Sequence, residues 1–180
     1  IYIVSFADIS ETMLENMQLE EKTLRDKLTN AYNREFFENN YQKLIETFKS
    51  EDMYFGLAMI DIDNFKNIND SYGHNIGDEI LINLVSIINK FSRNDDILIR
   101  WGGEEFIIIL KVSSENRLNV ILENIRKTIE KSKIDGLPTI TCSFGGTIYE
   151  NNEQINDTIK RADEALYIAK ANGKNKVILK

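Results

Sequence analysis

The sequence predicts an α+β fold: a ferredoxin-like or palm-type β-α-β-β-α-β core with an antiparallel central sheet flanked by helices, plus an N-terminal linker helix. Three observations predict it. Apolar runs of strand length alternate with helical periodicities in that order. Two of these runs are separated by the pair Gly102-Gly103, which favours a β-hairpin with a two-residue turn. The 180 residues, of which 42% are hydrophobic, suit one domain with a modest extension.

Composition narrows the possible functions. The formal net charge of −7 disfavours a binder of nucleic-acid polymers, whereas a small phosphorylated substrate requires only a local basic cluster. The single cysteine, Cys142, excludes a disulfide framework and fits a reducing compartment. No apolar run reaches the roughly 18 residues of a membrane span, and no signal peptide is recognisable. We therefore expect a cytoplasmic domain without direct membrane contact. Because the chain starts at Ile1 without Met, it resembles a fragment whose full-length protein could be membrane-tethered upstream.

The first 28 residues predict a strand followed by a linker helix. Residues 1–9 are β-branched and aromatic enough for a strand, and Ser10 is a suitable N-cap. A heptad-like seam with one acid follows, formed by Leu14, Met17, Glu21, Leu24 and Leu28. We expect a parallel dimeric coiled coil over residues 11–28, with a solvated amphipathic helix as the alternative.

The next two elements are an amphipathic helix and a buried strand. Residues 34–50 place six apolar side chains on one helical face, namely Phe36, Phe37, Tyr41, Leu44, Ile45 and Phe48. Asn30, between the two helices, tolerates the left-handed turn that a helix end requires. The continuous apolar run 54–60 predicts a central strand buried on both faces, and it ends in Asp61-Ile62-Asp63.

The rest of the chain alternates helices with strands. Its polar, glycine-marked segments 64–70 and 73–78 predict turns. Gly173 supplies the stop for the last helix. The remaining expected elements are a helix over 77–91, hairpin strands near 97–101 and 105–111, a helix near 115–132, a strand near 138–146, a helix near 156–172 and a last strand over 176–179.

The expected topology brings two distant carboxylates together. In a split β-α-β sheet the third strand inserts between the first two, so the end of strand one lies beside the start of strand three. Asp61 closes strand one, and Glu104 opens strand three. Two close carboxylates require a compensating cation, and hard oxygen ligands select Mg²⁺ or Mn²⁺. Asp63 shares the strand face of Asp61, and we expect it to be mainly structural.

Two of the turn residues have the chemistry to recognise guanine. Asp78 can accept from N1–H and the exocyclic amine, while the amide of Asn69 can donate to O6 or N7. Lys66 can clamp a phosphate, which backbone N–H groups of such turns can also hold. The alternative for Asp78 is an acid favoured by its helix dipole, and residue chemistry alone favours that alternative. The hairpin alone fits equally a metal-bearing phosphate ligand or a glycine turn with solvated acids.

Four separated segments carry motifs. The hairpin contains Gly102-Gly103-Glu104-Glu105-Phe106. The others are Asp26-x-Leu28-Thr29 with Asn33-Arg34, Asp61-Ile62-Asp63-x-Phe65-Lys66-x-Ile68-Asn69-Asp70-x-x-Gly73-His74-x-x-Gly77-Asp78, and Ala162-Asp163-x-Ala165-Leu166-Tyr167-x-Ala169-Lys170-x-x-Gly173-Lys174-Asn175. Together they resemble the GGDEF-domain diguanylate cyclases, in the GGEEF variant, over about residues 26–180. The combined motifs are very specific.

The resemblance implies an enzyme that condenses two GTP molecules into cyclic di-GMP, with release of two pyrophosphates, at the interface of a homodimer. It implies that Asp61 and Glu104 bind Mg²⁺ with help from the Ile62 carbonyl. It places Glu105 near the metal and the reacting 3′-hydroxyl. The implied guanine-binding residues are Asn69 and Asp78, and the implied phosphate-binding residues are Phe65, Lys66, Lys170 and Lys174.

A second ligand site is implied just upstream of the hairpin. Arg93 and Asp96 resemble the family's inhibitory product-binding motif, in which arginine bridges phosphate and stacks on guanine while aspartate reads the guanine edge. The alternative is an ordinary polar loop. Where some relatives place a supporting arginine on the following helix, this chain has Asn124, so product binding is expected to be weaker.

The resemblance also divides the chain. Residues 3–11 resemble the closing strand and exit of a PAS sensor domain, so we expect a sensor tail over 1–10, a signalling helix over 11–28 and the catalytic domain over 29–180. Asn30-Ala31 departs from the Gly-Leu that the family prefers, which affects a helix junction. The rival functions are a non-catalytic receptor for GTP or cyclic di-GMP and another nucleotidyl cyclase on a palm-like fold. The complete set of acids with Asn69 and Asp78 disfavours both.

Overall fold

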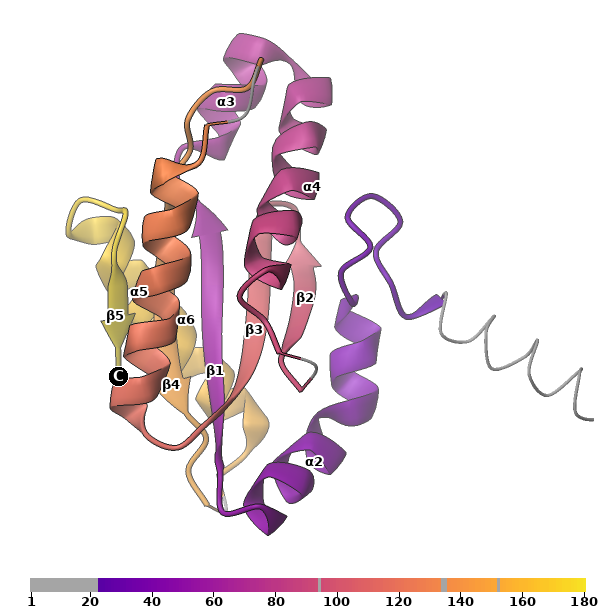
Figure 1. Ribbon diagram of the computed structural model, residues 1–180, viewed down its shortest axis with the longest axis vertical. Coiled ribbons are helices and arrows are strands. Elements are labelled where there is room, and N and C mark those ends of the chain that lie inside the picture. The colour runs from indigo at the N-terminus through magenta and orange to yellow at the C-terminus, as the bar shows by residue number, and fades with distance from the viewer. Residues whose placement is uncertain (1–22, 94, 134–135, 152) are drawn as a thin grey trace, which may run out of the picture.

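The computed structural model describes residues 23–180 except 94, 134–135 and 152. These residues form a five-stranded sheet with helices on both faces (Figure 1). In chain order the elements are α2 (Arg34–Ser50), β1 (Tyr54–Ile62), α3 (Phe65–Tyr72), α4 (His74–Asn89), β2 (Ile97–Gly102), β3 (Glu105–Val112), α5 (Glu115–Lys131), β4 (Cys142–Ile148), α6 (Ile155–Ala171) and β5 (Val177–Leu179).

The strand order β2-β3-β1-β4-β5 confirms the predicted core. The third strand, β3, inserts between β2 and β1 and runs antiparallel to both. On its other side β1 pairs antiparallel with β4. The additional strand β5 pairs parallel with β4 at the edge, so the sheet as a whole is mixed and the antiparallel description holds for its four-stranded core.

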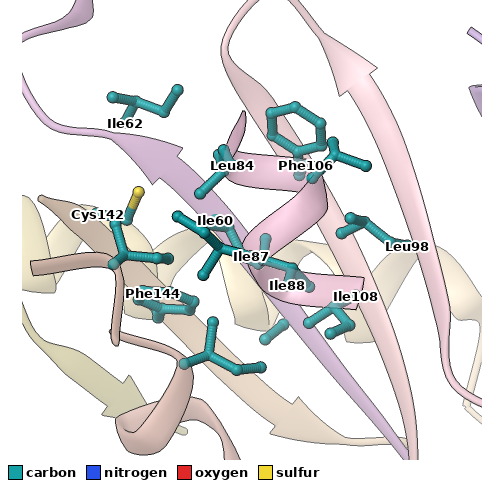
Figure 2. Close-up of a cluster of buried hydrophobic side chains, with 14 of the residues drawn as sticks. Ile60, Ile62, Leu84, Ile87, Ile88, Leu98, Phe106, Ile108, Cys142 and Phe144 are labelled. Carbon is teal, nitrogen blue, oxygen red and sulfur yellow. The ribbon is translucent and has the colours of Figure 1, made fainter. Parts of the chain in front are cut away.

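Strand β1 is buried along its length except at its first residue, because both faces of the sheet are covered. Successive side chains point to opposite faces. One set packs under α4 and α5 (Figure 2), where Ile60 and Phe106 meet Leu84 and Ile88 of α4. The other set, which includes Leu57 and Met59, packs against α2 and α6. The result is a three-layer arrangement that holds the ends of the central strands rigidly.

The structure differs from the sequence prediction around α3 and α4 and at the start of β4. The segment 64–70, predicted as a turn, lies mostly in the helix α3, and α4 already begins at His74 rather than at residue 77. Gly73 separates the two helices with a φ of 86°, which a glycine adopts without steric cost. The strand predicted near 138–146 begins only at Cys142, and Pro138, which lacks a backbone N–H, stays outside the ladder.

The predicted linker lies mostly outside the described residues. This applies to the strand over 1–9, to Ser10, and to Leu14, Met17 and Glu21 of the seam. The expected continuation of the helix to Leu28 is wrong. From Leu24 onward the chain forms a turn, in which Asp26 accepts hydrogen bonds from the backbone N (2.9 Å) and hydroxyl (2.7 Å) of Thr29. Leu28 packs against the core, and Asn30 adopts the expected left-handed conformation, with φ 60°.

None of the helices in the described ranges is long and apolar enough to cross a membrane.

Candidate functional site

The acidic residues gather at the end of the sheet towards which β1 and β2 run, next to α3 (Figure 1). Here Asp61 of β1 pairs with Glu105 of β3 in the antiparallel register. The register between β2 and β3 shifts from Arg100–Phe106 to Gly102–Glu105, which leaves Trp101 as an extra residue. The hairpin turn therefore consists of Gly103, with φ 51°, and Glu104. The prediction that Glu104 opens the strand is wrong by one residue, and Glu105 takes that place.

The carboxylates at this end of the sheet repel one another. Burial raises the pKa of Asp61, the neighbouring charges of Glu104 and Asp63 raise it further, and Lys170 acts against them. Burial and the charge of Asp61 raise the pKa of Glu105. In the structure the Nζ of Lys170 lies 2.7 Å from a carboxylate oxygen of Asp61, so an ammonium group partly compensates the acids. The cluster has the electrostatics of a cation site.

The donor atoms fit a hard divalent cation that brings other ligands with it. In the described part of the chain no three His, Cys, Asp or Glu side chains are grouped closely enough to hold a metal ion by themselves. Asp61 is only 7% exposed, Glu104 is half-buried, and Ile62 is buried at the end of β1. Carboxylate oxygens suit Mg²⁺, which usually retains water or substrate phosphate among its six ligands. These residues therefore fit Mg²⁺ arriving with a phosphorylated substrate.

Asp63 has a different environment from Asp61. Its carboxylate accepts hydrogen bonds from the hydroxyls of Thr141 and Ser143, both at 2.7 Å, and from the backbone N of Asn175 at 3.0 Å. It is 5% exposed, and its oxygens are occupied by these donors. This agrees with the structural role expected for it, because the three bonds tie the end of β1 to β4 and to the segment after α6.

The residues expected to bind the nucleotide lie on both sides of the α3–α4 junction. Phe65, 7% exposed, begins α3, and Lys66 beside it is exposed. Asn69 is half-buried on α3, and its buried Oδ1 has no hydrogen-bond partner among the residues that the structure describes. Asp78 is exposed in the first part of α4, immediately after Gly77, which contacts Asn69. The structure thus brings the amide and the carboxylate to one junction.

The two lysines of the C-terminal motif reach the same end of the sheet. Lys170, on α6, pairs with Asp61 as described above. Lys174 follows α6 in a left-handed conformation, with φ 62°, and donates from its Nζ to Oδ1 of Asn64 at 2.5 Å. Both ammonium groups are therefore held by protein acceptors at the end of β1.

Arg93 and Asp96 lie in the loop before β2, at the opposite end of that strand from the hairpin turn. Arg93 is exposed, but the carboxylate of Asp96 accepts from the backbone N of Arg93 (2.8 Å) and of Lys111 (3.4 Å). Burial raises the pKa of Asp96. The structure does not bring this pair to the acidic cluster, and Asn124 is exposed on α5.

Sequence reasoning missed two residues of the site. Arg100 donates from Nε (3.0 Å) and Nη2 (2.9 Å) to the carbonyl of Gly103, and from Nη1 to Asp26 at 2.9 Å. Asp163, on α6, adds negative charge near Glu105 and raises its pKa. Arg100 could have been noticed in the sequence, because it is a basic residue within a strand run that is otherwise apolar. Its partner, 74 positions away, is recognisable only once the fold is known.

A family model described as "Diguanylate cyclase, GGDEF domain" matches residues 23–176. The similar curated proteins include diguanylate cyclase DgcM of Escherichia coli (strain K12), 37% identical over 171 residues, which are 95% of this chain and 42% of DgcM. Diguanylate cyclase A of Treponema denticola is 37% identical over 184 residues, which cover 98% of this chain and 50% of that protein. The chain therefore spans half or less of the length of these relatives.

Solved structures are similar along nearly the whole chain. The coiled coil and GGDEF domain of DgcB from Caulobacter crescentus, in complex with c-di-GMP, superposes with a TM-score of 0.87 at 28% identity. That match covers 98% of this chain and 95% of the DgcB chain. The active GGEEF domain of a diguanylate cyclase from Vibrio cholerae gives a TM-score of 0.75 at 31% identity, covering 82% of this chain and 96% of that domain.

Proposed function

The chain belongs to the GGDEF family of diguanylate cyclase domains, and from this premise we propose that it condenses two molecules of GTP into cyclic di-GMP with release of two pyrophosphates. The observation that carries the proposal is the opposition of Asp61 and Glu105 at the end of the central strands, with Glu104 in the adjoining turn. A binding module needs no such concentration of mutually repelling acids. A metal-dependent phosphoryl-transfer site does need it.

In the proposed site, Asp61 and Glu104 hold Mg²⁺ or Mn²⁺ together with the Ile62 carbonyl. Such an ion, when bound, neutralises charge on the phosphates and lowers the pKa of a bound hydroxyl. Glu105 lies beside Asp61 and has a raised pKa because of burial, so it is suited to receive the proton of the attacking 3′-hydroxyl. The 3′-oxygen forms a bond to the α-phosphorus of the other GTP, and the bond from that phosphorus to pyrophosphate breaks.

The basic residues bind and orient the triphosphate in this proposal. Lys170 would be free to bind a phosphate if a divalent cation neutralised Asp61 in its place. Lys174, which donates to Asn64, and Lys66, exposed at the start of α3, would bind phosphates, and Phe65 would line the site. Asn69 and Asp78 read the guanine edge, because an amide and a carboxylate match the acceptors and donors of that edge.

Two copies of the domain are required by the reaction. Each 3′-hydroxyl must reach the α-phosphate of the other nucleotide, and each copy carries one acidic cluster. We therefore propose a homodimer in which the two hairpins face each other. Residues 29–180 would be the cytoplasmic catalytic unit, residues 11–28 a signalling helix and residues 1–10 the tail of a PAS-like sensor.

A product-binding site around Arg93 and Asp96 is a further part of the proposal. The exposed guanidinium of Arg93 supports it, since arginine binds phosphate and stacks on bases. Asp96 would have to give up one of its two backbone donors to accept from guanine. With Asn124 in place of a supporting arginine, we expect weak feedback inhibition.

The deciding experiment is incubation of the purified protein with GTP and Mg²⁺ over a range of protein concentrations, followed by chromatography of the nucleotides. We expect cyclic di-GMP and pyrophosphate, with a rate that rises more than linearly with protein concentration. The variant Glu104→Ala should fold and produce none. Binding of GTP or cyclic di-GMP without turnover, in wild type at every concentration, would establish a receptor instead.

A further inference from the structure

Gly77 and the side chain of Asn69 are in direct contact across the α3–α4 junction. A Cβ atom built on Gly77 would lie 2.0 Å from Oδ1 of Asn69 and 3.0 Å from its Cγ. The same atom would lie 3.2 Å from the tip of the Phe65 ring. The overlapping Oδ1 is the end of the Asn69 side chain and is buried, so the overlap is relieved only by moving that amide. Any side chain at position 77 would therefore push the Asn69 amide out of its place.

The backbone of Gly77 gives no other reason for a glycine. Gly77 lies within α4 and has no positive φ, unlike Gly73 before it. Glycine is the least favourable ordinary residue in a helix and alanine the most favourable. The position therefore contains a poor helix former, and the nearest atoms that a Cβ there would meet belong to Asn69 and Phe65.

In the structure the Asn69 amide faces Gly77 with its oxygen. Its Oδ1 is buried near Gly77 and has no partner in the described part of the chain, whereas Nδ2 is not among the buried atoms that lack a hydrogen bond. The amide thus offers a donor outward, next to Asp78, which follows Gly77 directly. The 6-oxo group of a purine accepts from such a donor, whereas a 6-amino group in the same place is itself a donor and cannot accept.

We propose that Gly77 is a positioning residue for base selection: the missing side chain seats the Asn69 amide at the depth from which it donates to a 6-oxopurine. This inference rests on the proposed function, because it gives a physical basis for the guanine selectivity assigned to Asn69 and Asp78. In this inference Gly77 contacts no ligand and acts on base selection through Asn69 alone.

The first test measures nucleotide binding without turnover. The probes are the α,β-methylene analogues of GTP and ATP with Mg²⁺, titrated by calorimetry into the whole chain. Gly77→Ala should weaken binding of the GTP analogue about 10-fold and change binding of the ATP analogue less than about 2-fold, since the phosphate contacts remain. The control Ser86→Ala, at an exposed position of α4, should alter neither.

The second test is a double-mutant cycle with Asn69→Ala. If Gly77 acts through Asn69, Gly77→Ala should cause no further loss of GTP-analogue affinity in the Asn69→Ala background. Equal weakening of both analogues, unchanged selectivity, or an additive loss in the double variant would each overturn the proposal. Equal binding of the two analogues by wild type would instead refute the assignment of the base-reading residues.

Thermal unfolding tests the contact between Gly77 and Asn69 without any ligand. Gly77→Ala should unfold at a lower temperature than wild type because of the overlap with Oδ1. In the Asn69→Ala background the overlapping atom is gone, so the same change should leave the midpoint equal or higher. A Gly77→Ala variant that fails to fold agrees with the proposal if the double variant folds. A double variant that also fails to fold contradicts it.

Discussion

Asp61 and Glu105 are directly opposed across the antiparallel pair of β1 and β3, so two acidic side chains share the end of the central strands. Like charges in this position destabilise a sheet. Burial of both residues makes it less favourable to keep the two carboxylates charged, as the raised pKa of each carboxyl indicates. The fold therefore holds an unfavourable pair of acids, which Lys170 compensates in part.

The first prediction concerns Glu105→Gln. Removing one of the opposed charges should raise the free energy of unfolding by about 0.5 kcal/mol, or about 1–2 °C in the thermal midpoint. Because the proton acceptor is lost, cyclic di-GMP formation should fall by about 10²-fold or more. Calorimetric unfolding and the nucleotide assay measure the two effects.

Glu46→Gln is the matched control, because Glu46 is exposed on α2, away from the site. It should leave both the midpoint and the rate unchanged. A Glu105→Gln protein that is less stable than wild type would show that the opposed pair is not repulsive in the absence of ligand.

The second prediction concerns the connection between the N-terminal turn and the hairpin. Arg100 donates to Asp26 with one nitrogen and to the Gly103 carbonyl with two others, so it ties the turn at residues 24–30 to the turn that carries Glu104. Asp26→Asn retains an acceptor for Thr29 but removes the charge. It should lower the free energy of unfolding by about 1 kcal/mol and reduce turnover.

A double-mutant cycle with Arg100→Gln tests this connection. The two substitutions remove the same ion pair, so their effects on urea denaturation should be clearly less than additive. Additive losses would mean that the 2.9 Å contact between Asp26 and Arg100 contributes nothing measurable, although both side chains are partly buried.

The strands and long helices could be predicted because each shows a recognisable pattern of apolar residues in the sequence. The apolar run of β1 and the glycine-separated runs of β2 and β3 indicate buried neighbours directly. Helix α3 was not predicted, because Asn64, Asn67 and Asn69 favour turns. Its signal was weaker: Phe65, Ile68 and Tyr72 lie three and four residues apart, the spacing of one helical face.

The sequence predicted which segments meet at the site, but it did not predict the individual contacts between their residues. The split β-α-β topology places the end of β1 beside the hairpin, as expected. The continuous register of β1 with β3 opposes Glu105, and not Glu104, to Asp61, while the bulge at Trp101 of β2 leaves Glu104 in the hairpin turn. Bulges leave no dependable sequence signal. The ion pair of Lys170 with Asp61 joins α6 to β1, and such pairs follow from packing alone.

The third prediction is a pH dependence of stability from Glu153. Its carboxylate accepts both terminal nitrogens of Arg161, at 2.7 and 2.8 Å, and these bonds lower the pKa of Glu153 to about 2. The folded pKa is below the unfolded value of 4.5, so the unfolded state binds more protons between them. The stabilisation is therefore complete above about pH 4.5 and is lost as the pH falls through about 2.

Urea denaturation of wild type and Glu153→Gln between pH 2 and pH 7 measures this contribution. At pH 7 the variant should be less stable by about 2 kcal/mol, a value reduced from the full pKa shift because Glu153 is partly exposed. The difference should shrink steadily as the pH approaches 2. A difference that stays constant over this range would mean that the lost stability comes from packing and not from the charge of Glu153.

The last prediction concerns how α6 reaches the acidic cluster. A Cβ atom on Gly145 of β4 would lie 2.1 Å from the backbone N of Leu166 and 2.2 Å from the carbonyl oxygen of Ala162. Both are backbone atoms of α6, so a side chain there must push the helix away from the sheet. Gly145→Ala should lower the free energy of unfolding by about 3 kcal/mol.

Lys170 lies one turn beyond Leu166 on the same helix, so this displacement should also separate its Nζ from Asp61. We expect turnover per folded molecule to fall together with stability. Gly102→Ala is the control for stability, because a Cβ atom there meets nothing within 4 Å and Gly102 has no positive φ. If Gly145→Ala unfolds within about 1 °C of wild type, α6 does not depend on this close approach for its position, and Lys170 must be placed by other contacts.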